Sequence, residues 1–249
     1  MFTPEERACL RSSLLELAHK DQRITGAAIT GSVAASREDQ WSDVDLAFGV
    51  NTAADLPTVL SDFTAHMYDQ HGALHHVDVM AGAWTYRVFL LHNTLQVDLA
   101  FVVNTEFRAL APTFRLVFGK ANEPRHAPLP LPADVIGLAW LYALHARTCI
   151  ARRKLWQAEY MISGVRDHAL ALACIRHGLS SIHGRGIDLL PSEVTAPFQD
   201  SLVRQLDTDE LSRALRVVMY GLAHEISSVD KELAERLQEV LMAVSEFPL

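Results

Sequence analysis

A proline-rich stretch divides this chain into two parts with different patterns. Residues 120–132 hold four of the ten prolines in a sequence of 249 residues. Proline lacks the amide donor that helices and inner strands need, and it stiffens a connecting segment. A chain of this length is also longer than a typical single domain. We therefore predict a first domain at 1–120, a linker at 121–132 and a second domain at 133–249.

The first part mixes strands with helices. The opening Thr3-Pro4-Glu5-Glu6 is typical of a helix start, because Thr3 can cap it and Glu6 completes a capping box. Apolar runs bounded by turn residues predict the strands. We expect helices at 4–19 and 55–71, and strands at 24–30, 44–50, 75–80, 86–92 and 95–103, with residues 92–95 turning the last two into a hairpin.

The second part reads as helix throughout. Helical periodicity and capping residues predict helices at 133–150, 153–177, 192–205, 209–226 and 230–244. No strand-like alternation occurs in this part. The fold class is therefore α+β, with a mixed-sheet domain followed by an all-helical C-terminal domain.

Composition and charge restrict the class of protein. Apolar residues make up 49% of the chain and charged residues 21%, which is globular composition. The longest uncharged apolar run, 135–144, is about half of what a membrane span needs, and the N-terminus lacks an apolar signal region. We expect a cytoplasmic protein with no membrane partner. The net charge of −8 argues against a nucleic-acid partner.

Metal binding through cysteine or histidine is not indicated. The three cysteines are odd in number and show no CxxC spacing, so neither a disulfide framework nor a structural zinc site is expected. His66, His71, His75 and His76 are irregularly spaced and have no cysteine near them. We interpret them as surface and strand-edge histidines rather than zinc ligands.

The most informative motif joins a Gly-Ser turn to two aspartates. Gly31 and Ser32 end a predicted strand, and Asp43 and Asp45 open the next strand after a gap of ten residues. In a strand, residues i and i+2 point to the same face, so the two carboxylates project side by side. Adjacent carboxylates repel unless a proton or cation lies between them, and a divalent cation such as Mg²⁺ prefers oxygen ligands.

A third carboxylate completes the predicted cluster. Asp98 lies inside a strongly apolar strand, between Val97 and Leu99. If that strand pairs beside the first two aspartates, three carboxylates could hold two metal ions for an in-line displacement at phosphorus. Asp78 is the alternative third residue. We prefer Asp98, because its strand is longer and more apolar.

This motif resembles the nucleotidyltransferase superfamily of DNA polymerase β type. The resemblance covers roughly residues 24–103, and the helical second part makes the chain most similar to the nucleotidyltransferases that modify aminoglycosides or lincosamides. It implies that Gly31 and Ser32 bind the triphosphate and that Asp43 and Asp45 bind metal. It also implies that Asp98 ligates a metal or helps to activate the acceptor hydroxyl.

The resemblance also implies the cofactors and partners. We expect two Mg²⁺ ions, a nucleoside triphosphate that we take to be ATP, and a small molecule with a hydroxyl acceptor. Family members often have an arginine-glycine pair soon after Gly-Ser. In this sequence Arg37 is the candidate to take that place and to contact the nucleotide.

A second group of polar residues lies on the predicted helix 153–177. Glu159, Ser163 and Arg166 follow i, i+4, i+7 and so share one helix face, with Asp167 adjacent. In one interpretation this stripe faces the catalytic cleft, with Glu159 or Asp167 as general base or as a ligand for a cationic acceptor, and Arg166 on phosphate. In the other, the stripe is an internal ion-pair network of Glu159–Arg166 or Arg166–Asp167.

The sequence thus predicts a Mg-dependent transferase that moves a nucleoside monophosphate, AMP, to a hydroxyl of a small molecule. An antibiotic and a housekeeping substrate are both consistent with the motif. Two alternatives stay open. One is an enzyme that adenylylates a protein, and the other is an antitoxin-like or regulatory module that binds nucleotide without catalysis.

Overall fold

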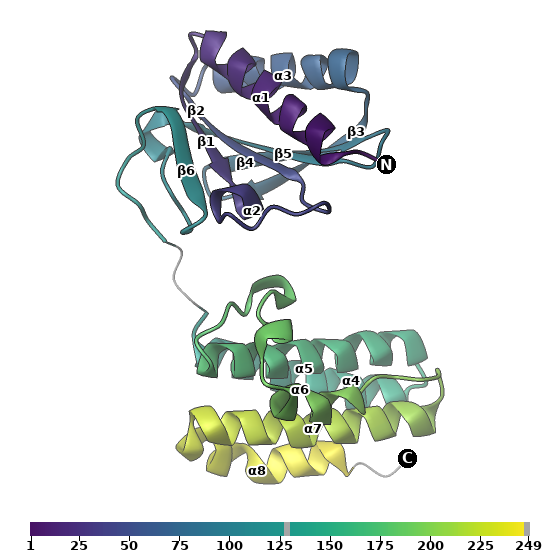
Figure 1. Cartoon of the computed structure of the whole chain (residues 1–249). Coiled ribbons are helices and arrows are strands. Elements are labelled where there is room, and N and C mark those ends of the chain that lie inside the picture. The colour runs from purple at the N-terminus through teal and green to yellow at the C-terminus, as the bar shows by residue number, and fades with distance from the viewer. Residues whose placement is uncertain (127–129, 247–249) are drawn as a thin grey trace. The chain divides into compact units, whose positions relative to one another are not determined.

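A computed structural model gives the fold of residues 1–126 and 130–246 (Figure 1). The chain divides into two compact units, Met1–Pro128 and Leu129–Leu249. Residues 127–129 of the predicted linker and 247–249 of the predicted second domain lie outside the described residues.

The first unit is built on a six-stranded mixed sheet with the order β3-β4-β5-β2-β1-β6. Its strands pair antiparallel except β2 and β5, which are parallel. The strands are β1 (Ile24–Thr30), β2 (Val44–Val50), β3 (Ala73–Ala81), β4 (Trp84–Leu91), β5 (Gln96–Val103) and β6 (Phe114–Gly119).

Helices α1 (Pro4–Lys20) and α3 (Leu56–His71) cover one face of this sheet (Figure 1). Apolar side chains that alternate along β2 and β5 point into that layer, where Phe48, Phe63 and Phe101 pack with their ring centroids 5.3–5.4 Å apart. The predicted capping box holds α1, since the Thr3 hydroxyl accepts from the Glu6 amide and the Glu6 carboxylate accepts from the Thr3 amide. Because α1 and α3 bury this face of the sheet, polar side chains of the strands lie on the opposite face.

The predicted hairpin is present. The Leu91 amide donates to the Leu95 carbonyl across the turn between β4 and β5. The one-turn helix α2 (Gly31–Ala34) and the strand β6 were not predicted, nor were the one-turn 3₁₀ segments given below. In β6 the side chains of Leu116 and Val117 are 43% and 45% exposed, so its residues show no alternation of buried and polar positions.

The second unit is helical within its described residues. Its long helices are α4 (Pro132–Ala151), α5 (Leu155–Arg176), α7 (Thr208–Val229) and α8 (Lys231–Ser245), and α6 (Ser192–Gln199) is shorter. Between α5 and α6 lie two one-turn 3₁₀ segments, η2 (Ile182–Gly184) and η3 (Ile187–Leu189), and a further one, η1 (Asn104–Glu106), follows β5 in the first unit. Asp207 and Asp230 cap α7 and α8 through their side chains.

The prediction of a helix over 192–205 is wrong beyond Gln199. The chain turns there, and arginine side chains take over carbonyls that a longer helix would have bonded internally. Arg166 donates to the Ser201 carbonyl at 3.1 Å, and Arg213 donates to the carbonyls of Asp200 and Leu202. These contacts tie the turn to α5 and α7.

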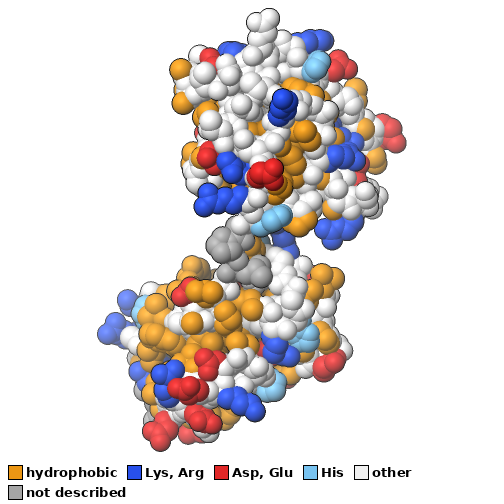
Figure 2. Space-filling model, turned by 90° about the vertical axis from the view of Figure 1, so that its left-hand side faces the viewer, with side chains coloured by type: hydrophobic (Ala, Val, Ile, Leu, Met, Phe, Trp, Pro, Cys, Tyr) orange, Lys and Arg blue, Asp and Glu red, His pale blue; other side chains and the backbone are white. Residues whose placement is uncertain are grey.

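The predicted fold class is confirmed, as an α+β unit with a mixed sheet followed by a helical unit. Cys9, Cys149 and Cys174 are free thiols. Among the described residues, none of the helices has the length and apolarity to cross a membrane. Figure 2 shows acidic and basic side chains interspersed on the face in view of each unit.

Candidate functional site

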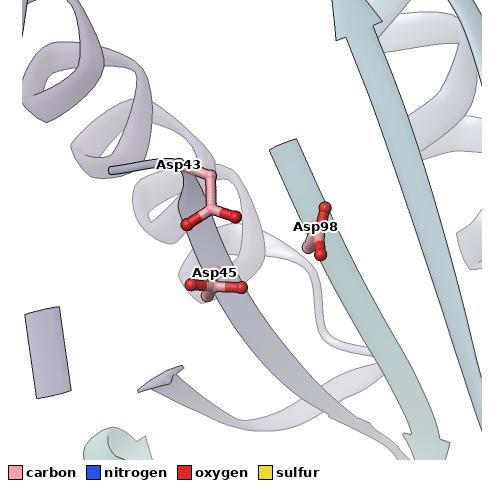
Figure 3. A group of neighbouring side chains, drawn as sticks. All are labelled: Asp43, Asp45 and Asp98. Carbon is pink, nitrogen blue, oxygen red and sulfur yellow. The ribbon is translucent and has the colours of Figure 1, made fainter. Parts of the chain in front are cut away.

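Three aspartates converge on the open face of the sheet in the first unit. Asp43 immediately precedes β2, Asp45 is its second residue, and Asp98 lies on β5 beside it (Figure 3). One carboxylate oxygen from each lies within 4.8 Å of the others. All three side chains are half-buried. Within the described residues, no other set of three histidine, cysteine or carboxylate groups is as close.

Strand register brings the aspartates together. In the parallel pairing of β2 with β5, Asp45 is the register partner of Asp98. The alternate residues Val44 and Leu46 are 0% and 1% exposed and pack in the helix-covered core. Burying those two side chains forces Asp43 and Asp45 to the other face, because strand side chains alternate.

Gly31 lets the turn after β1 approach Asp45. Its φ is +63°, a conformation that favours glycine. A Cβ built at this position would lie 1.8 Å from Oδ2 of Asp45, closer than any side chain can come. Both the positive φ and the close approach of Asp45 therefore favour glycine at this position. The backbone of the Gly-Ser turn lies directly against the carboxylate cluster.

The Ser32 hydroxyl is an unusual feature of this turn. Its Oγ is buried and has no hydrogen-bond partner among the described residues. A buried hydroxyl without a partner costs about 1–3 kcal/mol, so such groups are rare in folded proteins. A ligand oxygen bound at this turn would satisfy the hydroxyl.

The electrostatics of the cluster favour a cation. Burial raises the pKa of Asp98, the nearby charge of Asp43 raises it further, and a hydrogen bond from Gln96 opposes both. The Gln96 amide nitrogen lies 3.0 Å from Oδ1 of Asp98 and 3.5 Å from Oδ2 of Asp43, and so bridges them. Three carboxylates in an all-oxygen set suit Mg²⁺. These residues therefore fit the metal that the sequence resemblance implies.

Sequence reasoning missed two residues that support the cluster. Gln96 could have been found, because it lies two residues before Asp98 and so shares its strand face. Arg7 gave no such signal. It is 3% exposed on α1, donates to the carbonyls of Asp39 and Ser42 at 2.7 and 2.8 Å, and lies 2.9 Å from the Glu38 carboxylate. Arg7 thereby fixes the loop that leads into Asp43.

The alternative third carboxylate, Asp78, lies elsewhere. It is on the edge strand β3, which β4 and β5 separate from β2, and both its oxygens accept from Arg87 at 2.7 Å. Those hydrogen bonds lower the pKa of Asp78. Its charge is thus neutralised within β3 and β4.

The candidates on α5 belong to the second unit. Arg166 donates to Ser163 and Ser163 donates to Glu159, and among the described residues no ion pair joins Arg166 to Glu159 or Asp167. The predicted ion pairs are therefore absent there, and a hydrogen-bond chain through Ser163 connects Arg166 to Glu159 instead. Asp167 is exposed and lines a cavity of about 470 Å³ within this unit.

Arg37 follows the Gly-Ser turn with an exposed side chain. Its backbone amide donates to the Ser32 carbonyl at 2.9 Å, which closes the turn after α2. The histidines form no group of three ligands among the described residues, although His66 and His71 place their Nε2 atoms 3.2 Å apart.

No protein-family model and no curated protein sequence matches this chain. It is similar to the crystal structure of an aminoglycoside 6-adenyltransferase from Bacillus subtilis, with 11% sequence identity and a TM-score of 0.42. That similarity covers 98% of this chain and 99% of the other.

Proposed function

We propose that the protein transfers a nucleoside monophosphate from a Mg²⁺-bound nucleoside triphosphate, ATP, to a hydroxyl of a small molecule and releases pyrophosphate. The observation that supports this proposal is the cluster of Asp43, Asp45 and Asp98 directly against the Gly31–Ser32 turn, where the Ser32 hydroxyl is unpartnered. Carboxylates for metal and a turn for phosphate are the two parts that such a reaction needs.

The chain's own residues would act by holding and orienting the substrates. Asp43, Asp45 and Asp98 would hold the metal, which when bound neutralises phosphate charge and polarises the reacting phosphorus. Ser32 would donate its hydroxyl to a phosphate oxygen, and the positive-φ turn at Gly31 would bring backbone close to the same group. Gln96 would keep Asp43 and Asp98 at a fixed separation.

The reaction balances as a displacement at the α-phosphorus. The acceptor oxygen forms a bond to that phosphorus, the bond to the β-phosphate oxygen breaks, and the electron pair leaves with pyrophosphate. The proton of the acceptor hydroxyl passes to a base. Asp98 is the candidate base within the cluster, while Glu159 and Asp167 are the candidates from the second unit.

The test is Mg²⁺-dependent ATP binding by calorimetry, followed by pyrophosphate release across a panel of hydroxyl acceptors. We expect Asp43→Asn, Asp45→Asn and Asp98→Asn each to lose metal-dependent binding. Asp78→Asn is the matched control, because it removes an aspartate of the same sheet outside the cluster. ATP binding that is independent of Mg²⁺, or that survives in all three variants, would contradict the proposal. Pyrophosphate release with a protein acceptor alone would redirect it to protein adenylylation.

A further inference from the structure

A cavity of about 130 Å³ lies on the same face of the sheet as the aspartate cluster. Its floor includes Ala47 and Ala100, which are two residues beyond Asp45 and Asp98 on the same strands. Strand residues two apart share a face and lie about 6.6–6.8 Å apart. The cavity therefore begins one pleat away from the carboxylates.

Small residues create this space. Ala28, Ala47 and Ala100 are consecutive register partners across β1, β2 and β5, and Tyr86 on β4 continues the same row. Central strands usually hold β-branched or aromatic side chains, which fill the space above a sheet. Ala47 and Ala100 line the cavity, and their small side chains leave room next to the row that contains Asp45 and Asp98, whereas Ala28 packs in the core cluster with Trp84 and Phe107.

The walls of the cavity are aromatic, with one cationic group. Trp84, Tyr86 and Phe114 line it together with Arg108. The Arg108 Nε is buried and has no hydrogen-bond partner among the described residues, while its NH2 group donates to the Thr105 carbonyl at 2.7 Å. The walls offer flat apolar surfaces, and Arg108 offers one unused donor.

We propose that this cavity holds a ring of the nucleoside of the donor nucleotide, an inference that rests on the nucleotidyl transfer proposed above. The α-phosphorus joins the ribose through one oxygen, so the nucleoside of a bound nucleotide lies next to the phosphate that the metal holds, and the cavity begins one pleat from the metal-binding carboxylates. Thr30, which also lines the cavity, directly precedes the Gly31–Ser32 turn. Aromatic walls stack on ring faces, and Arg108 Nε donates to a ring or sugar acceptor.

The experiment compares Mg²⁺-ATP with Mg²⁺-tripolyphosphate, which lacks the nucleoside, by calorimetry on the full chain. Wild type should bind ATP about tenfold or more tightly, as stacking of one base provides. Ala100→Leu, which fills the cavity, should remove this preference and leave tripolyphosphate binding unchanged. Arg108→Met, which keeps the stem and adds no bulk, should reduce the preference even if Ala100→Leu folds poorly. Ala54→Leu on an exposed loop is the control.

The outcomes separate the two proposals. Equal binding of ATP and tripolyphosphate by wild type, or a preference that survives in both cavity variants, overturns the cavity assignment and leaves the transferase proposal standing. Binding of neither compound in the presence of Mg²⁺ overturns both.

A separate observation concerns the edge strand β3. It is nine residues long, it contains no lysine, arginine or proline, and its outer edge has no partner strand among the described residues. Leu74, Val77, Val79 and Met80 are 51–64% exposed. Monomeric proteins usually protect such an edge with charge, proline or a bulge, because its free backbone groups invite another strand. In β3 the register irregularity lies at the start of the strand, between Ala73 and His75, and Asp78 is paired with Arg87.

The sequence of this strand, Ala-Leu-His-His-Val-Asp-Val-Met-Ala, is self-complementary about Val77. Antiparallel pairing with a second copy around a twofold axis at Val77 places Leu74 opposite Met80, and His76 opposite Asp78. Moving the twofold axis by one residue keeps each side chain on the same face of the sheet. It would, however, place Asp78 opposite Asp78, or His76 opposite His76. Like groups directly opposite each other are unfavourable when charged.

We infer that two copies of this chain pair through β3 in the register centred on Val77. Such an interface is isologous, as expected of a twofold dimer. It joins two sheets without using the open face that holds the aspartate cluster, and it does not depend on the proposed reaction.

Sedimentation and cysteine cross-linking test this interface. Wild type should sediment as a dimer, and Val77→Lys, which places two lysines face to face, should be a monomer with unchanged secondary structure. In a Cys9→Ser background, Val77→Cys should form a disulfide-linked dimer on mild oxidation, since directly opposite residues are about 4.5–5.5 Å apart. A mixture of Leu74→Cys and Met80→Cys chains should cross-link, and neither chain should do so alone. Leu116→Cys on the other edge strand is the control.

A monomeric wild type, or a dimer that persists in Val77→Lys, overturns the inference. Cross-linking of Leu74→Cys with itself overturns the register.

Discussion

Asp45 and Asp98 are direct register partners in the parallel ladder between β2 and β5. Parallel neighbours need a crossover between them, and here α3, β3 and β4 separate the two strands along the chain. Opposite positions on one sheet face bring the two carboxylates together at a half-buried site, where like charges destabilise the fold. The strand pairing thus places the Asp45 and Asp98 carboxylates where they repel each other, and a cation bound between them would remove this repulsion.

Neutralising Asp98 should therefore stabilise the protein when no metal is present. The pKa of Asp98 is raised chiefly by burial, so the fold disfavours its charged form. We expect Asp98→Asn to raise the melting temperature in EDTA by about 2–4 °C, equivalent to about 1 kcal/mol, and to abolish stabilisation by Mg²⁺. Differential scanning fluorimetry with and without Mg²⁺ measures both effects. Asp78→Asn should instead lower the melting temperature, because Arg87 loses its partner. A similar loss in Asp98→Asn would contradict the prediction.

Gly31→Ala should weaken Mg²⁺-ATP binding more than Gly82→Ala, a substitution with similar backbone strain. Gly31 and Gly82 both have positive φ, but a Cβ at Gly82 meets nothing within 4 Å, whereas one at Gly31 meets Asp45. We expect each variant to lose about 1 kcal/mol of stability from its backbone conformation, and Gly31→Ala alone to lose Mg²⁺-ATP binding. Urea unfolding and calorimetry separate the two losses. Equal binding by both variants would show that the contact with Asp45 is unimportant.

Arg7 should act as a positioning residue for Asp43. Arg7→Met keeps the buried stem but removes the donors to the Asp39 and Ser42 carbonyls, so the loop before Asp43 loses its anchor. We expect a stability loss of about 2 kcal/mol and weaker Mg²⁺ binding. Arg11→Met is the matched control, since Arg11 also binds Glu38 but contacts neither carbonyl. If Mg²⁺ affinity fell equally in Arg7→Met and Arg11→Met, the cause would be the lost contact with Glu38 and not the lost anchor of the loop.

The stability of the first unit should fall in mild acid through His71. Burial lowers the pKa of His71, and the neighbouring His66 lowers it further. A lowered pKa in the folded state means that the unfolded chain takes up the proton first. The stabilisation is complete above the unfolded value of about 6.5 and is lost as the pH falls below it.

Urea unfolding at several pH values between neutrality and pH 5 measures the slope of the free energy of unfolding against pH. His71→Gln should reduce it, whereas replacement of the exposed His177 should leave it in place. An unchanged slope in His71→Gln would show that other groups control the acid sensitivity.

Local signals predicted much of the first unit. Ile24–Thr30 and Val44–Val50 form strands within the predicted bounds, and Thr3 with Glu6 caps the first helix as expected. Each of these depends on residues close in sequence, whose periodicity and capping chemistry act before any tertiary contact exists. β6 was missed because its partner β1 is far away in sequence and its exposed apolar residues show no alternation.

The sequence by itself determined that Asp43 and Asp45 share a face, since alternation along a strand follows from backbone geometry alone. It also determined that a glycine precedes Ser32, at a turn that needs positive φ. Only the tertiary structure decided that Asp98 rather than Asp78 lies beside Asp45, that Gln96 bridges two of the carboxylates, and that Arg7 anchors their loop. Those relationships depend on which strands pair and which helix packs over them. Strand pairing depends on the packing of the whole core, so it cannot be predicted from any short segment of the sequence.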